Sequence, residues 1–181
     1  MEEEKKESFF SYIIMFVLAI ALALLIRTFV FSSNAVSGVS MNPSFKDGDR
    51  LISLVFPLYY RDPDYGDVVI IDSPIEENKE YIKRILGKPG DSIKIHDGNV
   101  YRNDEKLTEN YIEDGLETGI YNLDSWTLDK DEYFVMGDNR LPGKSADSRA
   151  FGPITRKSIR GIVRFRYWPL SQFGIIGGTD D

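Results

Sequence analysis

The pattern of apolar and polar positions divides the chain into one long apolar segment followed by many short runs. Residues 9–26 contain no charged side chain, and Arg27 and the apolar residues 29–31 follow them. A helix of about 18 to 23 residues matches the roughly 30 Å hydrocarbon core of a bilayer. Arg27 would extend its charged group to the interface. We therefore predict a polar tail at residues 1–8 and a transmembrane anchor at residues 9–31.

The charges that flank this segment indicate its orientation. Lys5 and Lys6 precede the apolar run and favour a cytoplasmic N-terminus, although Arg27 and Lys46 flank the other end. A cleavable signal peptide is the alternative, because Ala35-Val36-Ser37 has the small-x-small pattern of a cleavage site. The run exceeds the usual h-region of about 7 to 15 residues, which favours a retained anchor. We expect a single-pass protein of the cell membrane, with an extracytoplasmic main domain.

Beyond residue 32 the pattern changes to short runs that are rich in β-branched and aromatic residues and are separated by Gly, Pro and Asp. Many short strands with frequent turns favour an antiparallel barrel or sandwich. We predict a mainly β fold, with one domain at residues 32–175 and a C-terminal tail at 176–181. Residues 102–131 are more polar, which indicates a solvated outer part of the domain. The clearest strand-like runs are Arg50–Val55, Asp67–Ile71, Tyr81–Leu86, Ser92–Ile95 and Glu132–Met136.

The composition of the chain excludes several kinds of partner and site. A net charge of −7 argues against a nucleic-acid partner, and the absence of cysteine excludes disulfides, thiolate metal sites and a cysteine nucleophile. His96, the only histidine, is expected at the solvated end of a strand, beside a hairpin turn at Asp97-Gly98. The acidic residues at 102–131 lack the pattern of a calcium loop. We therefore predict no metal and no cofactor.

The first stretch with catalytic potential is Ser37–Ser44, which follows the apolar segment. Gly38 would let the backbone approach a substrate carbonyl closely, and Pro43 would stiffen the loop. Ser40 is therefore a candidate nucleophile held near a membrane surface. The alternative is an ordinary turn, because Ser, Gly and Pro are common in loops.

Lys83 is the candidate base, because a serine hydroxyl needs a proton acceptor and histidine is nearly excluded. It shares one strand face with Tyr81 and Ile85, whereas Arg84 points the other way. One of these two adjacent cations is thus expected among mostly apolar neighbours. Lowering a lysine pKa from about 10.4 to near 8 takes roughly 3 kcal/mol of differential desolvation, which a closed apolar surround can supply. The alternative is a strand lysine that extends its amine into water.

A third polar stretch, Met136–Arg149, begins within an apolar strand. Ser145, Asp147 and Arg149 alternate in this stretch as if they line one face. As a site, the stretch would supply a hydroxyl that orients the lysine amine and an Asp-Arg pair that fixes the loop. As an ordinary loop, it would hold one surface ion pair worth about 0–1 kcal/mol.

Together the three stretches resemble segments of the type I signal peptidases, the bacterial leader peptidases. Members of that family have a membrane span, a Ser-Met-x-Pro-Thr loop, a Tyr-x-Lys-Arg-x-x-Gly-x-Pro-Gly-Asp segment and a Gly-Asp-Asn-Arg...Ser-x-Asp-Ser-Arg segment. The corresponding segments here, in the same order, are Ser40–Ser44, Tyr81–Asp91 and Gly137–Arg149. Gly66–Val69 and Tyr167–Leu170 also resemble family segments, so the resemblance extends from the anchor to about Leu170.

The resemblance implies a membrane-anchored serine endopeptidase that removes signal peptides from exported preproteins after small-x-small sites. The expected partners are secretory preproteins and the lipid bilayer. The expected fold is an antiparallel β-sheet catalytic core with a small inserted outer subdomain, here at residues 88–132. The roles implied are Ser40 as nucleophile, Lys83 as general base, Ser145 as the hydroxyl that positions the lysine amine, Asp147, Arg149 and Asp138 as braces, and Met41 and Pro43 as residues that shape the nucleophile loop.

The chain departs from the family pattern at three places. Ser44 stands where threonine is usual, which keeps a hydroxyl. Four residues, Leu141–Lys144, separate Arg140 from Ser145, where the family commonly has fewer. Gly38 stands where some members have a serine that donates to the oxyanion, so the Ser40 N–H is the first expected donor and the second is left open.

Two other functions are compatible with parts of the pattern. One is a different membrane-tethered Ser-Lys peptidase, related to the self-cleaving repressors, although the membrane span and the lack of a helix-turn-helix pattern speak against a repressor. The other is a non-catalytic β domain that only binds exported chains, for which the serine and the lysine would be unnecessary.

Overall fold

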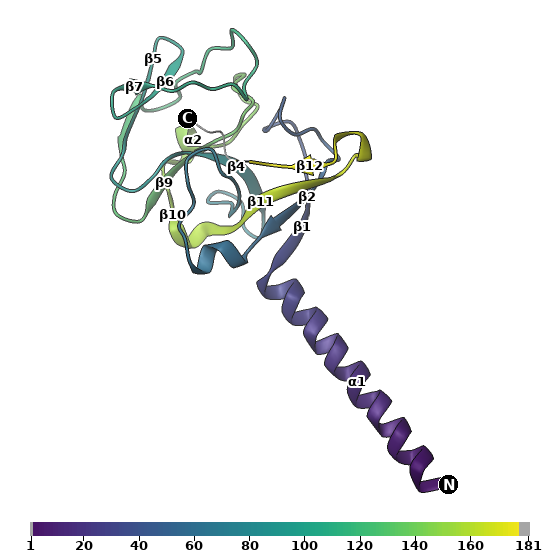
Figure 1. Cartoon of the computed structure of the whole chain (residues 1–181). Coiled ribbons are helices and arrows are strands. Elements are labelled where there is room, and N and C mark those ends of the chain that lie inside the picture. Colours follow the sequence, from purple (N-terminus) through teal and green to yellow (C-terminus); the bar gives the residue numbers. More distant parts are fainter. Residues whose placement is uncertain (1, 178–181) are drawn as a thin grey trace.

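The computed structural model describes residues 2–177 of the 181-residue chain, except for the side chains of residues 2–8 and 25–29. A helix, α1 (Glu2–Phe29), projects from a β domain (Figure 1). The helix begins within the predicted polar tail and ends shortly before Phe31, where the first strand begins. Phe31, the predicted last residue of the anchor, is the first residue of that strand and pairs with Leu54 of the neighbouring strand.

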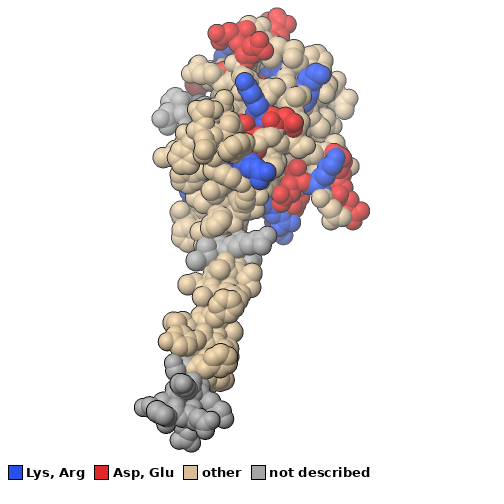
Figure 2. All heavy atoms as spheres, turned by 90° about the vertical axis from the view of Figure 1, so that its right-hand side faces the viewer, with Lys and Arg blue, Asp and Glu red and all other residues tan. Residues whose placement is uncertain are grey.

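The apolar side chains of α1 are exposed. Between residues 9 and 24 the helix has no charged residue, and its large apolar side chains are 44–68% exposed. Figure 2 shows this part of α1 as an uncharged stalk below a domain whose surface carries charges of both signs. Within the described residues, no helix combines the length and the hydropathy that a membrane span requires.

The larger of two sheets forms the body of the β domain. Its strand order is β1-β2-β11-β3-β4-β9-β10, with β12 paired to β11, and every pairing is antiparallel. This arrangement confirms the predicted mainly antiparallel β fold. The strands are β1 (Phe31–Ala35), β2 (Arg50–Leu54), β3 (Val68–Asp72), β4 (Glu80–Gly87), β9 (Glu132–Met136), β10 (Ile154–Thr155), β11 (Ile159–Trp168) and β12 (Gly174–Ile175).

The smaller sheet is inserted between β4 and β9 and has the order β7-β6-β5-β8. Its strands are β5 (Ser92–His96), β6 (Asn99–Arg102), β7 (Glu105–Lys106) and β8 (Ser125–Thr127), which lie within the predicted subdomain at 88–132. β5 and β6 form the predicted hairpin, with positive φ at Asp97 and Gly98. His96 is exposed at the strand end, as predicted. The five strands predicted from sequence are all present, each with its ends within one residue of the prediction.

Short helices and the C-terminal segment complete the described domain. The helices are η1 (Phe56–Tyr59), α2 (Ser148–Phe151), η2 (Arg156–Ser158) and η3 (Leu170–Gln172). Ile176, in the predicted C-terminal tail, packs against the core, and its N–H donates to the carbonyl of Arg164 over 2.8 Å. Residues 178–181 of that predicted tail lie outside the described residues.

The core consists of three apolar clusters. The large sheet is covered on both faces, because alternate residues of β3 enter different clusters: Val69 and Ile71 on one face, Val68 and Ile70 on the other. Burial on both faces explains why β3 is a continuous apolar run. The third cluster joins the two sheets and contains Leu86, Ile93, Ile95, Val100, Leu128, Phe134 and Met136.

β11, the longest strand in the described part of the chain, was not predicted from the sequence; it lies between β2 and β3 in the sheet. Three arginines interrupt its apolar pattern, so its sequence resembles a basic segment rather than a strand. In the fold, each of them pairs with an aspartate at or next to another strand: Arg160 with Asp72, Arg164 with Asp67, and Arg166 with Asp49. These partners are distant in sequence, so the local pattern does not reveal them.

Candidate active site

Ser40 and Lys83 are brought together by two different parts of the fold. Ser40 lies in the loop between β1 and β2, and Lys83 lies on β4. The Lys83 Nζ is 3.2 Å from the Ser40 Oγ and donates a second hydrogen bond to the carbonyl of Ile82 over 3.0 Å. Lys83 is 2% exposed, whereas Ser40 is half-buried. The two residues predicted to carry the chemistry are therefore within hydrogen-bonding distance.

The surroundings of Lys83 favour the neutral amine. Burial lowers the pKa of Lys83 from 10.5 to about 8, although the negative charges of Asp147 and Asp138 oppose this shift. Val69, opposite Lys83 on β3, belongs with Ile85 to the same buried apolar cluster, against which Tyr81 packs. An appreciable fraction of the Lys83 amine is then neutral near pH 8, which a proton acceptor requires.

Hydrogen bonds within the loop fix the position of Ser40. The N–H of Asn42 donates to the carbonyl of Val39 (3.1 Å), and the N–H of Phe45 donates to the carbonyl of Met41 (2.9 Å). Met41, predicted to shape this loop, is 1% exposed and packs into the second apolar cluster. The Ser40 N–H has no hydrogen-bond acceptor in the part of the chain that the structure describes. It is therefore available to a substrate.

Gly38 has a conformation that only glycine adopts readily. Its φ is +90°, and its N–H donates to the Asp47 carboxylate over 2.7 Å. The Gly38 N–H is thus already used within the loop. The second donor for an oxyanion, left open by the sequence, is not this N–H in the structure.

Asn139 connects the third sequence stretch to the nucleophile loop. Its backbone N–H donates to the carbonyl of Ser40 (3.0 Å), and its side-chain amide donates to the carbonyl of Val39 (2.9 Å). The C=O and N–H of a trans peptide point in opposite directions. The bond to Val39 therefore fixes the direction of the Ser40 N–H. No role was predicted for Asn139, although it lies within the third motif.

Gly137 allows the two segments to approach closely. A Cβ at this position would lie 2.3 Å from the carbonyl oxygen of Ser40 and 2.4 Å from the Ser145 Oγ. Both distances are far below a van der Waals contact. Any other residue at position 137 would push the third stretch away from Ser40.

The predicted brace of Asp147 and Arg149 is a buried ion pair. Arg149 donates to both carboxylate oxygens of Asp147, over 2.9 and 2.8 Å, and the Gly137 N–H donates to the same carboxylate over 3.2 Å. Burial alone would raise the pKa of Asp147, but Arg149, with smaller contributions from the Ser145 hydroxyl and the Gly137 N–H, lowers it. Asp147 also caps the N-terminus of α2. It is thus held as a carboxylate.

Ser145 is buried next to these residues, but its predicted contact is not formed. Its hydroxyl makes no hydrogen bond of normal geometry, and the Lys83 amine bonds to Ser40 and Ile82 instead. The positioning of the amine by Ser145 stays a prediction. In the structure, Ser145 lies against Gly137, at the point where the third stretch meets the nucleophile loop.

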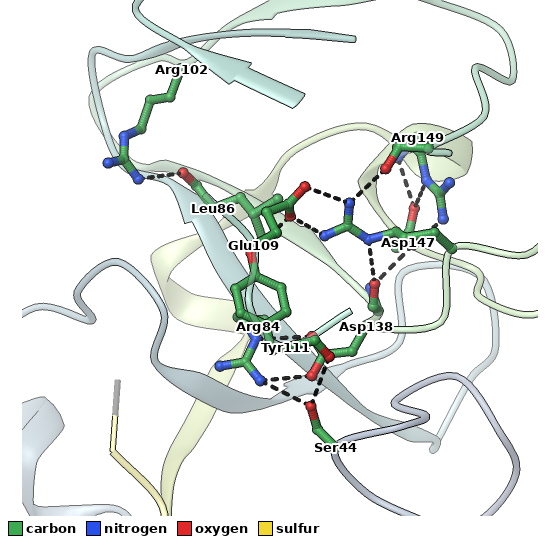
Figure 3. Close-up of polar contacts among 12 residues, drawn as sticks. Ser44, Arg84, Leu86, Arg102, Glu109, Tyr111, Asp138, Asp147 and Arg149 are labelled. Carbon is green, nitrogen blue, oxygen red and sulfur yellow. Dashed lines mark hydrogen bonds and ion pairs between the residues drawn. The ribbon is translucent and has the colours of Figure 1, made fainter. Parts of the chain in front are cut away.

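Arg84, the other cation of the adjacent pair, is also buried, but among polar and aromatic partners rather than apolar ones. Arg84 is 4% exposed, and its guanidinium donates to both oxygens of Asp138, over 2.9 and 2.6 Å (Figure 3). It also donates to the carbonyl of Gly66 and lies 4.0 Å from the ring of Tyr111. Asp138, predicted as a brace, therefore holds Arg84, and sequence alone did not show this because the two residues are far apart in the chain.

The carboxylates at the site are engaged by arginines rather than arranged around a metal. Asp138 and Asp147 are both fully buried, and each accepts two bonds from one guanidinium. In the described part of the chain, no three His, Asp or Glu side chains come together as metal ligands would.

A hydroxyl beside a desolvated lysine amine, with a free backbone N–H at the same residue, is the geometry that a serine hydrolase with a lysine as base would require. The model of the family described as signal peptidase, peptidase S26, matches residues 9–168. The chain therefore belongs to the signal peptidase family, peptidase S26, and it is a serine peptidase.

Named relatives match nearly the whole chain. The signal peptidase I of Bacillus licheniformis is 36% identical over 176 residues, which cover 93% of each protein. The signal peptidase IB of Staphylococcus aureus strain N315 is 32% identical over 183 residues, which cover 93% of this chain and 94% of the relative. A solved signal peptidase I from Enterococcus faecalis V583 is 28% identical, with a TM-score of 0.48, and covers 56% of this chain and 97% of that one.

Proposed function

We propose that this chain removes signal peptides from exported preproteins, with Ser40 as nucleophile and Lys83 as general base. This mechanism is supported by the 3.2 Å separation between the Ser40 hydroxyl oxygen and the buried Lys83 amine. The choice of substrate is supported by the relatives, which are named signal peptidases.

In the proposed reaction, the neutral Lys83 amine takes the Ser40 proton while Oγ attacks the scissile carbonyl carbon. The developing oxyanion accepts a hydrogen bond from the Ser40 N–H, which Asn139 orients through the Val39 carbonyl. The Lys83 ammonium then protonates the leaving amine, which departs as the mature chain. Lys83 next takes a proton from water, which attacks the acyl-enzyme. Lys83 then returns this proton to the Ser40 Oγ as its ester bond to the acyl carbon breaks, and the signal peptide leaves with a new carboxyl terminus.

The substrate is proposed to bind as an extended strand beside this pair. Among the residues that the structure describes, β1 pairs with β2 alone and β4 pairs with β9 only from Arg84 onward, so the Glu80–Lys83 half of β4 has an open edge. The Asn34 amide lies 3.5 Å from the Glu80 carboxylate, which places the edges of β1 and β4 near each other. Unpaired strand edges bind extended peptides through backbone hydrogen bonds. Small residues are expected just before the cut and two positions earlier.

We also propose that α1 anchors the enzyme in the cell membrane with the N-terminus in the cytoplasm. A helix that is apolar on all sides needs an apolar environment. Phe56, Tyr59 and Tyr60 are 54–65% exposed on and after η1, and the N–H of Val55 donates to the carbonyl of Val30, close to the end of α1. Exposed aromatic residues at that position suit a membrane interface. Sharing one membrane would raise the effective concentration of enzyme and signal peptide.

The function is tested with a purified preprotein and the full chain in detergent. Ser40→Ala and Lys83→Met should each abolish cleavage, whereas the matched controls Ser37→Ala and Lys94→Met, both at exposed positions, should cleave normally. Mass spectrometry of the products should place the cut after a small-x-small site. Cleavage elsewhere would indicate a different Ser-Lys peptidase, and binding without cleavage by the wild type would indicate a non-catalytic domain.

The topology is tested with single cysteines, because the chain has none. A membrane-impermeant maleimide added to intact cells should label Asp97→Cys on the exposed β5–β6 turn. It should label Glu3→Cys only after the cells are lysed. The reverse pattern, or full extraction of the chain by alkaline carbonate, would contradict the proposed anchor.

A further inference from the structure

Three buried arginines surround the proposed site, and each of them contacts the same segment of the inserted subdomain, residues 109–121. Arg84 lies 4.0 Å from the Tyr111 ring, and Arg149 donates to the carbonyl of Gly119 over 3.3 Å. Arg140 is the third: it donates to Thr118 Oγ1 over 2.8 Å and forms an ion pair with Glu109. Figure 3 shows Glu109 and Tyr111 reaching toward this group of arginines and aspartates.

The origin of the carboxylates distinguishes Arg140 from the other two arginines. Arg84 and Arg149 pair with Asp138 and Asp147, which belong to the same third stretch that packs on the nucleophile loop. The carboxylate on Arg140 comes from the insert. The Arg140 side chain is fully buried and that of Glu109 is 7% exposed, so the pair lies out of water. Removing the Glu109 charge would leave a buried guanidinium without its carboxylate.

Arg140 is connected to the proposed nucleophile through hydrogen bonds of one turn. Its Nε donates to the carbonyl of Gly137 over 2.9 Å, which closes a tight turn around residues 137–140. Asn139, within this turn, holds the carbonyls of Val39 and Ser40. A displacement of Arg140 would therefore shift the 137–140 turn, and this turn would shift the hydroxyl and N–H of Ser40.

We propose that Glu109 of the inserted subdomain is a positioning residue for the proposed peptidase reaction, acting through Arg140 and the 137–140 turn on Ser40. This inference rests on the proposed function. Glu109 contacts Arg140 and Tyr111 and lies outside the strand edges proposed for the substrate. Its loss should therefore reduce turnover and leave substrate binding unchanged.

The test compares Glu109→Gln with Glu105→Gln, which alters an exposed glutamate on β7 of the same subdomain. With a signal-peptide substrate and protein shown to be folded by near-UV circular dichroism, Glu109→Gln should lower kcat by about ten- to a hundredfold. KM and the pH midpoint of the acid limb should stay at the wild-type values, because neither the substrate edges nor Lys83 is touched. Glu105→Gln should match the wild type, and Glu109→Gln should lower kcat little further in an Arg140→Gln background.

Different failures lead to different conclusions. A folded Glu109→Gln enzyme with wild-type kcat, or one with a raised KM and unchanged kcat, overturns the inference and leaves the proposed function intact. A wild-type chain that cleaves no signal peptide overturns both. If Glu109→Gln does not fold, Thr118→Val decides the matter, because it removes the other side-chain bond from the insert to Arg140: kcat should fall several-fold, and an unchanged kcat contradicts the inference.

Discussion

Lys83 and Arg84 are neighbours on β4, and both are buried, yet their chemical states differ. Lys83 faces an apolar cluster, and its amine lies beside the Ser40 hydroxyl, a backbone carbonyl and, at 5.1 Å, the ring of Tyr81. Arg84, on the opposite face, finds the Asp138 carboxylate, a backbone carbonyl and the face of Tyr111. Burial lowers the pKa of Lys83 to about 8. Burial opposes the charge on Arg84 too, but the bonds and charge of Asp138 outweigh it and raise the pKa of Arg84.

Burial alone therefore does not convert a cationic side chain into a base. A cation that is desolvated and left without a carboxylate gives up its proton readily, whereas one that is desolvated and paired keeps its charge and becomes a structural brace. Adjacent positions of one strand can hold a base and a structural brace, because successive side chains enter opposite faces of the sheet. Substitutions at the two positions should therefore have different effects on turnover and on stability.

Lys83→Arg should abolish turnover although it keeps the positive charge. A guanidinium stays protonated over the accessible pH range, so it cannot take the Ser40 proton. We expect the cleavage rate of a signal-peptide substrate to fall by at least about 10³-fold between pH 7 and 10. Lys94→Arg, at an exposed position of β5, is the control and should keep the wild-type rate. More than a tenth of wild-type activity in Lys83→Arg would show that Lys83 is not the base.

Arg84→Met should destabilise the fold strongly, because it leaves the fully buried Asp138 without its cation. Breaking a buried pair from one side costs about 3–5 kcal/mol of unfolding free energy. The measurement is urea unfolding of the full chain in a non-ionic detergent, with Lys94→Met as the control. The double variant Arg84→Met/Asp138→Leu should be more stable than Arg84→Met, and equal stability would contradict the pairing.

Lys83→Met should increase the unfolding free energy at neutral pH, whereas Arg84→Met should decrease it. The folded-state pKa of Lys83 is lowered from 10.5 to about 8, so between these values the unfolded chain binds more protons and stability rises with pH. Below pH 8 the wild type holds a buried ammonium, at a cost of about 3 kcal/mol. Lys83→Met should therefore be more stable than the wild type by up to that amount at pH 6. The advantage should shrink as pH rises toward 10.5, and a pH-independent difference would contradict the lowered pKa.

The pH dependence of activity should report the same amine. Below the Lys83 pKa of about 8, kcat/KM should rise about tenfold per pH unit, and above it the rate should level off. The profile is measured with a signal-peptide substrate over roughly pH 5.5–10, a range that extends to both sides of the Lys83 pKa. Lys94→Met should leave the midpoint unchanged. A profile without an acid limb near pH 8 would mean that another group accepts the proton.

The strands that could be predicted from sequence are those whose pattern is set locally. Runs such as Glu132–Met136 are apolar and end at turn residues, and the structure places that strand at the predicted bounds. β11 could not be predicted in this way, because its arginines are neutralised by aspartates of remote segments. β1 was missed because its polar residues, such as Ser32 and Ser33, are exposed on a strand at the edge of the sheet.

The residues of the candidate site also fall into two groups: those that a local motif reveals and those whose contacts depend on distant partners. Ser40 and Lys83 could be named because each lies in a short motif with a chemical reason for its residue type. Ser145 was expected at the lysine amine, but its hydroxyl is not bonded there. Glu109 had no local signal at all, since an acidic residue in a polar segment reads as a solvated surface group. Its burial depends on Arg140, 31 positions further along the chain.

The amino-acid sequence shows which groups are available for chemistry: one histidine at a turn, no cysteine, and a serine and a lysine in motif segments of a β domain. The charge states and hydrogen-bond partners of these groups depend on the fold. It placed the Lys83 amine beside Ser40 with no carboxylate to hold its proton, gave Arg84 a carboxylate from the opposite face, and closed the inserted segment over Arg140. The physical reason is that desolvation and ion pairing depend on what lies within a few ångströms in space, and for these groups the deciding neighbours are far away in sequence.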